Sequence, residues 1–390
     1  MGTFGAFPAE TGVEGPKEIL LGMSTALNGP VANLGQDMLQ GVLAGLERAN
    51  RAGGVQGCRL RLITLDDGYE PARTAPNIRQ LLEKDKVLAV IGDVGAPTTV
   101  AAVPIVNEDK ALFFAAFTGA GVLRKSPPDR YVINYRASYV EETRAIIDAL
   151  VDECGIKIED IAFFTQRDAC GDAGYTACIA ALERHGLKDG QLMLHARYDR
   201  NTLAVEDAVA EILSAAHAPR AIIMVGAYAP CAKFIKLVHE AGLDTTFINV
   251  SFVGSRSLAE ELGTLPVRVV VSEVVPHPVN GDLAIAQDYQ ADLKKIDPAA
   301  KPGSTSFEGY IAARILVLAL EKIQGPPTRE AIVDAMEGLG QFDIGLGEPL
   351  KFGPGNHQAC RHVWLTCLRD GEVAPLPWTA LPSLLTKDRQ

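Results

Sequence analysis

The sequence predicts an α/β protein of two lobes, each with a parallel sheet at its core. Short apolar runs alternate with amphipathic helical stretches between residues 19 and 323, and this alternation is typical of parallel sheets covered by helices on both faces. The chain has 390 residues, 47% of them hydrophobic. This length exceeds what one hydrophobic core usually serves, so two lobes are expected.

The expected strands and helices follow from hydrophobic periodicity. The first expected helix repeats apolar residues with a 3.6-residue period through Met38, Val42 and Leu46. The alternating run 363–368 predicts a hairpin or an edge strand. The other expected strands are residues 19–23, 59–65, 87–91, 111–115, 161–164, 221–225, 247–250 and 269–271. The other expected helices are residues 143–154, 174–185, 231–241 and 307–323, with one more around 81–82.

Composition excludes several classes of protein. A formal net charge of −11 argues against nucleic acid as a partner, because nucleic acid binds basic surfaces. No run of about 18 apolar residues occurs, so no insertion into a membrane is expected. Residues 1–17 lack a basic segment followed by a long apolar one. If the protein is exported, its signal peptide is expected to have been removed before residue 1.

Signals for an enzyme, a cofactor or a metal are weak. The glycine-containing segment 92–97 has the wrong spacing for a dinucleotide fingerprint, and neither a phosphate-binding loop nor a nucleophile elbow is present. His357, Cys360 and His362 are close in sequence, but on a strand His357 would face away from the other two. No cofactor and no metal are therefore expected.

The cysteines and acids also favour structural roles. The chain has seven cysteines, so at least one thiol is unpaired within a monomer. Cys170 precedes a helix, where a lowered thiol pKa is possible, but no histidine is placed to act as its base. A pocket wall or a disulfide is expected instead, and a Cys170–Cys231 bridge is conceivable. For Asp66, Asp67 and Asp168, capping or hinge roles are favoured over acid–base catalysis.

The binding site is expected at the carboxyl ends of the strands, where open α/β sheets bind ligands. The loops there are rich in small and hydroxyl residues and poor in charge, which suits a small ligand. Several of them lead into helices, whose N-terminal amides favour an anion such as a carboxylate. These loops are residues 28–34, 93–99, 116–120, 165–171, 226–231, 251–254 and 273–278.

Across residues 19–368 the chain resembles the substrate-binding proteins of branched-chain amino acid and amide ABC transporters, the leucine/isoleucine/valine-binding type. Each motif is weak alone, and their order and spacing together are specific. The motifs are Ala26-Leu27-Asn28-Gly29-Pro30, the segment 50–57, Asp66-Asp67, Val90-Ile91-Gly92, Thr118-Gly119-Ala120, Arg136-Ala137-Ser138-Tyr139 and Phe307-Glu308-Gly309-Tyr310.

The resemblance implies a type I periplasmic-binding fold, in which two Rossmann-like lobes are joined by a three-stranded hinge. The chain is expected to cross between the lobes near residues 137, 267 and 346. Lobe one would comprise 17–137 plus 268–346, and lobe two 138–267 plus 347–380. Residues 1–16 are expected to be disordered or vector-derived, and residues 381–390 to form a tail.

The resemblance also implies which residues hold the ligand. Backbone N–H groups and hydroxyls of lobe-one loops would bind a carboxylate, with Ala96 at a usual serine position and Thr98 left to supply a hydroxyl. Tyr228 matches a tyrosine that closes over the ligand, and Cys170 and Leu34 stand where aromatic residues are common. The expected ligand-binding residues are Leu34, Gly95, Ala96, Pro97, Thr98, Phe117, Thr118, Gly119, Ala120, Tyr139, Cys170, Tyr228, Ser251 and Phe252.

Ser251 is the departure that matters most. Amino-acid binders of this family carry a glutamate there, which pairs with the α-ammonium group, and leaving that group buried and unpaired is costly. A carboxylate or a neutral solute fits the residues better. Arg136 could grip such a carboxylate or form a hinge salt bridge. Glu273 or Asp168 could supply the missing acid.

The sequence therefore predicts a monomeric periplasmic solute-binding protein without enzymatic activity. Its partners would be a small organic ligand (a carboxylate, an amide or an amino-acid-like compound, including aromatic ones) and the membrane permease of an ABC transporter. A ligand sensor with the same fold is the alternative, and an enzyme on an α/β scaffold is the third hypothesis.

Overall fold

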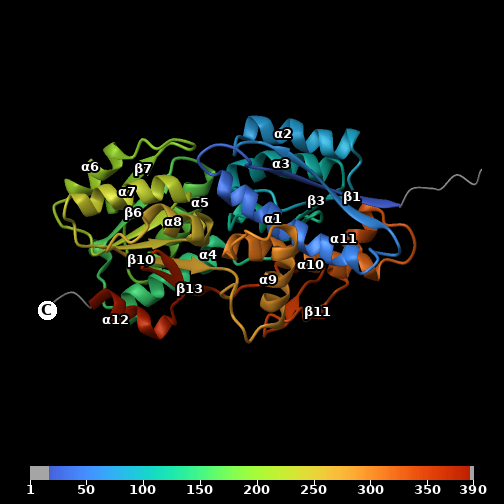
Figure 1. Ribbon diagram of the computed structural model, residues 1–390. Coiled ribbons are helices and arrows are strands. Elements are labelled where there is room, and N and C mark those ends of the chain that lie inside the picture. The colour runs from blue at the N-terminus through green and yellow to red at the C-terminus, as the bar shows by residue number, and fades with distance from the viewer. Residues whose placement is uncertain (1–16, 387–390) are drawn as a thin grey trace, which may run out of the picture.

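A computed structural model describes residues 17–386, which form two lobes side by side along one long axis (Figure 1). The expected disordered stretch 1–16 and the last four residues of the expected tail lie outside the described residues. Among those described, no helix is both long and apolar enough to cross a membrane.

Lobe one is built on a five-stranded parallel sheet in the order β2-β1-β3-β4-β5. Its strands are β1 (Glu18–Thr25), β2 (Arg59–Asp66), β3 (Ala89–Ile91), β4 (Leu112–Phe114) and β5 (Val132–Ile133). Its helices are α1 (Ala32–Arg51), α2 (Pro71–Arg79), α3 (Ala96–Glu108), α9 (Ala284–Ile296), α10 (Ser304–Lys322) and α11 (Arg329–Glu337).

Lobe two is built on a seven-stranded sheet in the order β14-β13-β10-β9-β8-β6-β7. Its strands are β6 (Ile161–Gln166), β7 (Leu194–Tyr198), β8 (Ala221–Val225), β9 (Thr246–Asn249), β10 (Arg268–Glu273), β13 (Trp364–Arg369) and β14 (Glu372–Pro375). Its helices are α4 (Tyr139–Asp148), α5 (Ala169–Arg184), α6 (Glu206–Leu213), α7 (Tyr228–Glu240), α8 (Ser255–Leu262) and α12 (Leu381–Thr386).

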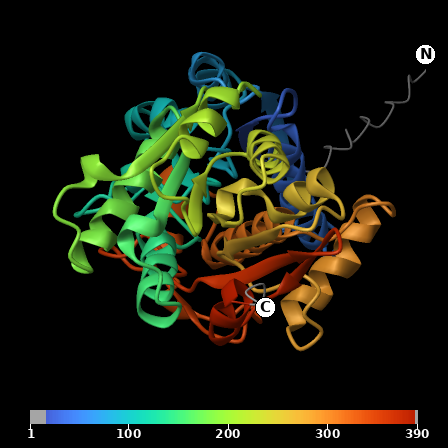
Figure 2. The same ribbon diagram turned by 90° about the vertical axis from the view of Figure 1, so that its left-hand side faces the viewer.

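The predicted fold class, two α/β lobes with parallel-sheet cores, is confirmed. The central strands of lobe two, such as β8, are buried along their whole length, as strands covered on both faces by helices must be. The predicted edge at 363–368 is β13, which pairs antiparallel with β10 and with β14. Figure 2 shows this hairpin along the lower edge of lobe two.

Three chain segments join the lobes, and two of them lie later than the sequence-based boundaries. Because β10 pairs in parallel with β9, residues 268–273 belong to the sheet of lobe two, and the second crossing follows Glu273. The short pair β11 (Gln341–Phe342) and β12 (Leu350–Lys351) forms a sheet of its own. The third crossing lies between β12 and β13.

The crossing segments are hydrogen-bonded to one another. The Asn134 N–H donates to the His357 carbonyl at 2.7 Å, and the Cys360 N–H donates to the Tyr135 carbonyl at 2.8 Å. The Tyr135 hydroxyl donates to the Val274 carbonyl at 3.3 Å. These hydrogen bonds join the three segments into one hinge. The carboxyl ends of the strands of both lobes meet beside this hinge.

Candidate functional site

The cleft between the lobes contains all the loops in which the candidate residues were predicted. In lobe one these loops follow β1, β3 and β4, and in lobe two they follow β6, β8 and β9, while the candidate Tyr139 begins α4. The two walls touch, because a Cβ added at Gly254 of lobe two would lie 2.4 Å from the Leu34 side chain of lobe one. Only glycine, which also adopts the positive φ found there (74°), permits this approach.

On the lobe-one wall, a tyrosine covers the start of α3. Gly95 precedes that helix with φ of 95°, and a Cβ at this position would lie 2.0 Å from a ring carbon of Tyr69. Tyr69 follows β2 and is itself in a left-handed conformation, with φ of 63°. A positive φ is uncommon for a bulky residue and marks a position that its surroundings hold in place. The Tyr69 ring therefore lies where the resemblance places a ligand carboxylate.

The predicted hydroxyl of Thr98 is used inside the helix. It donates to the Gly95 carbonyl at 2.8 Å, and the Thr99 hydroxyl donates to the same oxygen at 2.6 Å. In the neighbouring loop the Thr118 hydroxyl accepts from the Ala120 N–H at 3.3 Å. The hydroxyls of Thr98 and Thr99 thus serve their own helix, whereas the Thr118 hydroxyl also donates to the Tyr139 hydroxyl of lobe two at 3.5 Å.

The lobe-two wall contains Cys170 at the first turn of α5. Asp168 caps this helix, its carboxylate accepting from the Cys170 N–H at 2.9 Å, as the predicted capping role requires. The thiol lies 3.5 Å from the Tyr139 hydroxyl. Burial, and next the Asp168 charge, raise the pKa of the Cys170 thiol, so it stays protonated. The conceivable bridge to Cys231 is not formed, since both thiols are free.

Four aromatic side chains form what we call the aromatic centre: Tyr69 and Phe117 of lobe one, and Tyr139 and Phe252 of lobe two. The Phe252 ring lies between those of Tyr69 and Phe117, with a centroid distance of 5.9 Å to each. All four are at most 2% exposed. Aromatic pairs at such distances contribute packing and geometric specificity.

A chain of hydrogen bonds links the aromatic centre across the cleft. The Gln166 side-chain amide of lobe two donates to the Tyr69 hydroxyl of lobe one at 2.9 Å. The Tyr198 hydroxyl donates to the Gln166 oxygen at 3.0 Å and accepts from the Ala227 N–H at 3.1 Å. Burial raises the pKa of Tyr69 and of Tyr139 well above the usual range. Both phenols are therefore neutral hydrogen-bonding groups.

Ser251 has a buried acid behind it. The Glu142 carboxylate accepts from the Ser251 N–H at 2.9 Å, from the Ser251 hydroxyl at 3.0 Å and from the Ser272 hydroxyl at 2.6 Å. Glu142 is fully buried on α4. Glu142 lies next to Ser251, the position at which the family's glutamate is absent, and its carboxylate already has three hydrogen-bond donors.

Arg136 stands between Ser251 and α10. Its guanidinium donates to the Ser251 hydroxyl, and its Nε lies 3.6 Å from Glu308 Oε1. It also stacks over the Phe117 ring at 4.5 Å. Burial lowers the pKa of Arg136, but the Glu308 and Glu142 carboxylates outweigh that effect and raise it. Of the two predicted roles, this geometry fits the hinge salt bridge.

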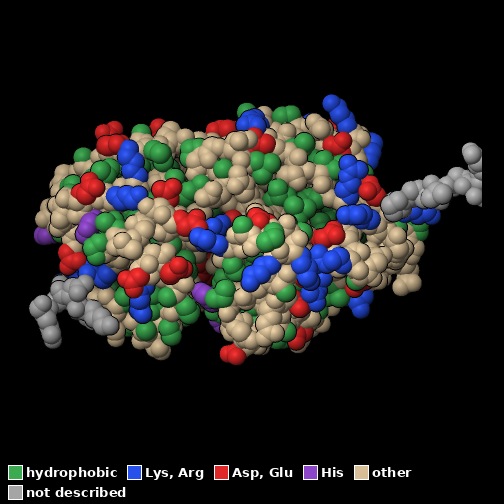
Figure 3. All heavy atoms as spheres, in the orientation of Figure 1, with side chains coloured by type: hydrophobic (Ala, Val, Ile, Leu, Met, Phe, Trp, Pro, Cys, Tyr) green, Lys and Arg blue, Asp and Glu red, His purple; other side chains and the backbone are tan. Residues whose placement is uncertain are grey.

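Charged contacts between the lobes surround the aromatic centre. In what we call the first rim cluster, Arg200 of lobe two binds Glu70 of lobe one at 2.8 Å and Asp168 of its own lobe at 3.2 Å. The Asn201 amide donates to the Glu70 carboxylate at 2.6 Å. Figure 3 shows side chains of both charge signs along the seam of the lobes on the face in view.

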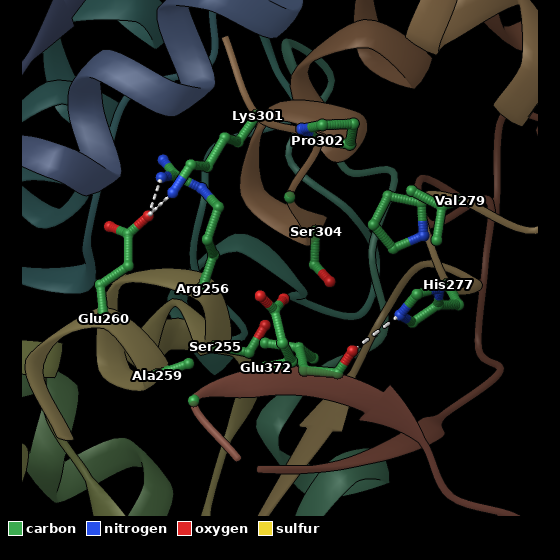
Figure 4. Close-up of a pocket in the computed structure, with 14 residues that line it drawn as sticks. Ser255, Arg256, Ala259, Glu260, His277, Val279, Lys301, Pro302, Ser304 and Glu372 are labelled. Carbon is green, nitrogen blue, oxygen red and sulfur yellow. Dashed lines mark hydrogen bonds and ion pairs between the residues drawn. The ribbon is translucent and has the colours of Figure 1, made fainter. Parts of the chain in front are cut away.

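The second rim cluster lies beside a pocket. Arg256 of lobe two binds Asp37 of lobe one at 2.5 Å and Glu260 of its own lobe at 2.9 Å, and Lys301 of lobe one lies 3.8 Å from Glu260. The pocket next to them has a volume of about 310 Å³ and residues of both lobes in its wall. In Figure 4 the Glu372 side chain points into it toward Ser255 and Ser304.

The remaining candidates lie at the same seam. The Tyr228 hydroxyl accepts from the Asn33 N–H of lobe one at 3.5 Å, so Tyr228 bridges the lobes. Gly119 lies against Tyr139, to whose N–H its carbonyl is bonded at 2.8 Å. Phe117 belongs to the aromatic centre, whereas Ala96 and Pro97 are buried in the first turn of α3. That any of these residues contacts a ligand stays a prediction.

Sequence reasoning missed Tyr69, Gln166 and Arg200. The first two stand at the carboxyl ends of β2 and β6, and applying the strand-end rule to β2 would have found Tyr69. Arg200 follows β7, whose loop was not among those considered.

Of the two acids proposed to replace the missing glutamate, Asp168 caps α5, and Glu273 is held by hydroxyls of Thr366, Ser255 and Ser304. In the described part of the chain, no cluster of three or more potential ligands could hold a metal.

Comparisons with known proteins agree with the motifs. A family profile described as periplasmic binding protein matches residues 18–372. The crystal structure of a possible leucine/isoleucine/valine-binding protein from Rhodopirellula baltica is 46% identical, with a TM-score of 0.90 over 93% of this chain and 97% of that one. A substrate-binding periplasmic protein from Ralstonia solanacearum is 24% identical, with a TM-score of 0.84 over 92% of this chain and 100% of its own.

A curated relative from Brucella suis, Leu/Ile/Val-binding protein homolog 7, is 23% identical over 95% of this chain and 92% of its own. The stated resemblance and the type I periplasmic-binding fold are thereby confirmed.

Proposed function

Because this chain belongs to the periplasmic binding protein family, we propose that it is a solute-binding protein of the periplasm. It captures a small organic ligand between its lobes and delivers it to the permease of an ABC transporter. It acts as a monomer and catalyses no reaction. The relative from Rhodopirellula baltica, named as a possible leucine/isoleucine/valine-binding protein, supports a ligand of amino-acid size.

The observation that carries the proposal is the cleft itself. Both lobes contribute buried side chains to it at the carboxyl ends of parallel strands, where α/β sheets bind ligands. The contacts that close it, such as Tyr69–Gln166 and Glu70–Arg200, join separate lobes across one hinge. A ligand held there stabilises the closed form, and closure presents a new surface to a membrane partner.

The chemistry of the walls supports binding without turnover. A potential nucleophile beside the aromatic centre is Cys170, whose thiol is buried and whose pKa is raised by that burial. Its thiol lies next to the Tyr139 hydroxyl, which is too weak an acid and base to activate it. A protonated thiol is a poor nucleophile, which fits a wall residue.

A thermal-shift screen against amino acids, amides, and aliphatic and aromatic carboxylates tests the proposal. A ligand at 100 times its dissociation constant adds about 2.7 kcal/mol to the free energy of unfolding. We expect one chemical series to raise Tm and small-angle scattering to show compaction with the same compounds. Failure of every compound to raise Tm would contradict the proposal, and so would chemical conversion of a compound that binds.

A further inference from the structure

We propose that the hinge contains a proton-binding centre and that the lobes close more firmly when this centre holds its protons. The centre, which we call the hinge acid cluster, consists of Glu142, Glu273 and Glu308 around Arg136. This inference rests on the proposed function and deepens it, because it makes the pH of the surroundings a regulator of the cleft.

The hinge acid cluster is buried where the lobes meet. Its four residues are at most 2% exposed. Glu142 lies on α4 of lobe two, Glu308 on α10 of lobe one, and Glu273 at the end of β10. Arg136 stands in the first crossing segment, and its guanidinium lies between Glu308 and the Ser251 hydroxyl. The cluster therefore connects both lobes through the hinge.

The acids of the cluster outnumber the positive charge that balances them. Within the described part of the chain, the one ion pair that these three acids form is between Glu308 and Arg136. If all three acids were ionised, three carboxylates would face one guanidinium, and two negative charges would be left over. Burying an ionised carboxylate without a counter-charge is strongly unfavourable, and such a group takes up a proton instead.

The hydrogen bonds indicate which acids hold the protons. Glu142 accepts from the Ser251 N–H and from two hydroxyls, and donors of this kind favour the ionised form. Glu273 is held by hydroxyls, which bond to either form because a hydroxyl both donates and accepts. Glu308 Oε1 is buried without a hydrogen-bond partner among the described residues. The protons therefore belong on Glu273 and Glu308.

The contact between Glu308 and Arg136 fits a protonated acid. Glu308 Oε1 and Arg136 Nε lie 3.6 Å apart, which is longer than a charge-assisted hydrogen bond. Neither atom has a hydrogen-bond partner elsewhere in the described residues. An ionised Glu308 would draw the guanidinium into a shorter contact, whereas a neutral acid does not. Buried polar atoms without partners are rare in native proteins, and each needs a physical explanation.

Burial acts on both proton-holding acids in the same direction. It raises the pKa of Glu273 and the pKa of Glu308 from 4.5 to about 7. The charge of Glu142 also raises the pKa of both acids, whereas Arg136 lowers the pKa of Glu308. Both acids thus keep their protons at a pH where exposed glutamates have lost theirs.

The other titratable groups that face Glu308 keep their charge over this range. Burial lowers the pKa of Arg124 to about 10, so this arginine stays charged and lowers the pKa of Glu308. Tyr135 and Cys360 also face Glu308. Burial raises the pKa of Tyr135 well above its usual range and the pKa of Cys360 to about 12, so both stay neutral.

Two charged side chains lie near the serines that hold Glu273. Glu372 of β14 points toward these serines (Figure 4) and is exposed to solvent. Arg256 on α8 is paired with acids of both lobes. Glu273 and Glu308 are thus the groups of the cluster that change charge between pH 4.5 and about 7.

Proton uptake is linked to closure because contacts of the cluster cross between the lobes. Glu308 of lobe one meets Ser251 of lobe two through Arg136, and Ser304 of lobe one bonds to Glu273. When the lobes part, these contacts separate and water reaches the acids. The pKa of each acid then returns toward 4.5.

The closed form therefore binds protons more tightly than the open form. The stability that the protons add to it is complete below pH 4.5 and is lost as the pH rises to about 7. A ligand that binds the closed form is consequently held more firmly on the acid side of this range.

Infrared spectroscopy tests for the protons directly, because a protonated carboxylic acid has a carbonyl band that an ionised carboxylate lacks. Between pH 4.5 and about 7, we expect this band in the unchanged protein and a weaker band in Glu273→Gln and in Glu308→Gln. Glu47→Gln is the matched control, because Glu47 pairs with Arg59 at 3.4 Å within lobe one, away from the hinge. A band of equal strength in both variants and the unchanged protein would overturn the proton-binding centre.

Small-angle scattering without any added solute tests the link to closure. We expect the radius of gyration to increase as the pH rises from 4.5 to about 7. The double variant Glu273→Gln with Glu308→Gln should not respond, because its neutral amides bind no proton in this range. A radius that is independent of pH in the unchanged protein would overturn the link, and so would an unaltered response in the double variant. The first outcome does not depend on the folding of the variant.

Neither measurement requires a ligand. Failure of either one overturns this inference and leaves the proposed function to the thermal-shift screen. Failure of that screen contradicts the proposed function and leaves the infrared band in place. The two failures are thus distinguishable.

Discussion

The centre and the rim of the cleft differ in kind. The aromatic centre is buried and neutral, and its contacts are ring packing and phenol hydrogen bonds. The rim clusters are charged and partly exposed, with 24% exposure for the side chains of both Arg200 and Arg256. Exposed ion pairs contribute about 0.2–1 kcal/mol each and weaken with salt. We therefore propose that the centre selects the ligand and that the rim adjusts how firmly the lobes close on it.

Removing the central ring of the aromatic centre has the largest expected effect. We expect Phe252→Ala to abolish ligand binding and to lower the free energy of unfolding by about 3 kcal/mol or more, the usual cost of such a cavity. Thermal melts and calorimetry measure the two effects. Leu213→Ala, at an exposed position (44%), is the control and should leave both unchanged. Ligand affinity that survives in Phe252→Ala would place the site elsewhere.

Tyr228 belongs to both regions, since its ring is buried and its hydroxyl reaches across to Asn33. We expect Tyr228→Ala to weaken binding by more than tenfold, because it removes a wall of the closed cleft. Tyr228→Phe should cost much less, since only the long hydrogen bond of 3.5 Å is lost. Unchanged affinity in Tyr228→Ala would mean that this residue does not cover the ligand.

A charge reversal isolates the first rim cluster. We expect Arg200→Glu to weaken ligand binding by about fivefold through repulsion of Glu70 across the lobes, and Arg200→Glu with Glu70→Arg to recover most of it. The loss should shrink at high salt. Arg167→Glu is the matched control, because Arg167 pairs with Asp199 inside lobe two at 3.0 Å. An equal loss in the control would show that closure does not depend on the Arg200–Glu70 pair.

The smallest expected effect is on the pH dependence of stability. Burial, partly offset by the hydroxyls of Ser255 and Ser304, raises the pKa of Glu273 from its ordinary value of 4.5 to about 7. The folded protein holds this proton more tightly than the unfolded chain does. The stability it contributes is therefore complete below pH 4.5 and is lost as the pH rises to about 7.

We expect Glu273→Gln to reduce the decline of Tm between pH 4.5 and 7 by a few degrees. Part of the decline should remain, since burial also raises the pKa of Glu308 to about 7. A slope identical to that of the unchanged protein would contradict the assignment of Glu273. Such a result would leave the comparison of centre and rim unaffected.

The sequence predicted the fold well because periodicity and strand-end rules are local. The sequence alone shows apolar runs such as β8 and the alternation of apolar and polar residues in β13. The lobe boundaries were harder, since the pairing of β10 with β9 depends on contacts between residues more than 20 positions apart. The order of the motifs identified the family, but it could not show which residues form hydrogen bonds or ion pairs across the cleft.

Only part of the candidate site was predicted, because the rest of it depends on contacts between segments that are distant in the sequence. The loops were found, and Phe117, Tyr139, Cys170 and Phe252 do converge. The use of the Thr98 hydroxyl by its own helix could not be read from residue types. Nor could the position of Glu142 behind Ser251, because α4 and the loop after β9 meet only in the folded protein.

The C-terminal hairpin has a consequence for handling the protein. β13 pairs with β10 on the side away from β9. β14 pairs with β13 and is the edge strand on that side of the sheet. A chain shortened before residue 364 would leave β10 with a row of unpaired amides and carbonyls. Such an edge is a template for other strands, so truncation there should convert a well-behaved protein into one that aggregates.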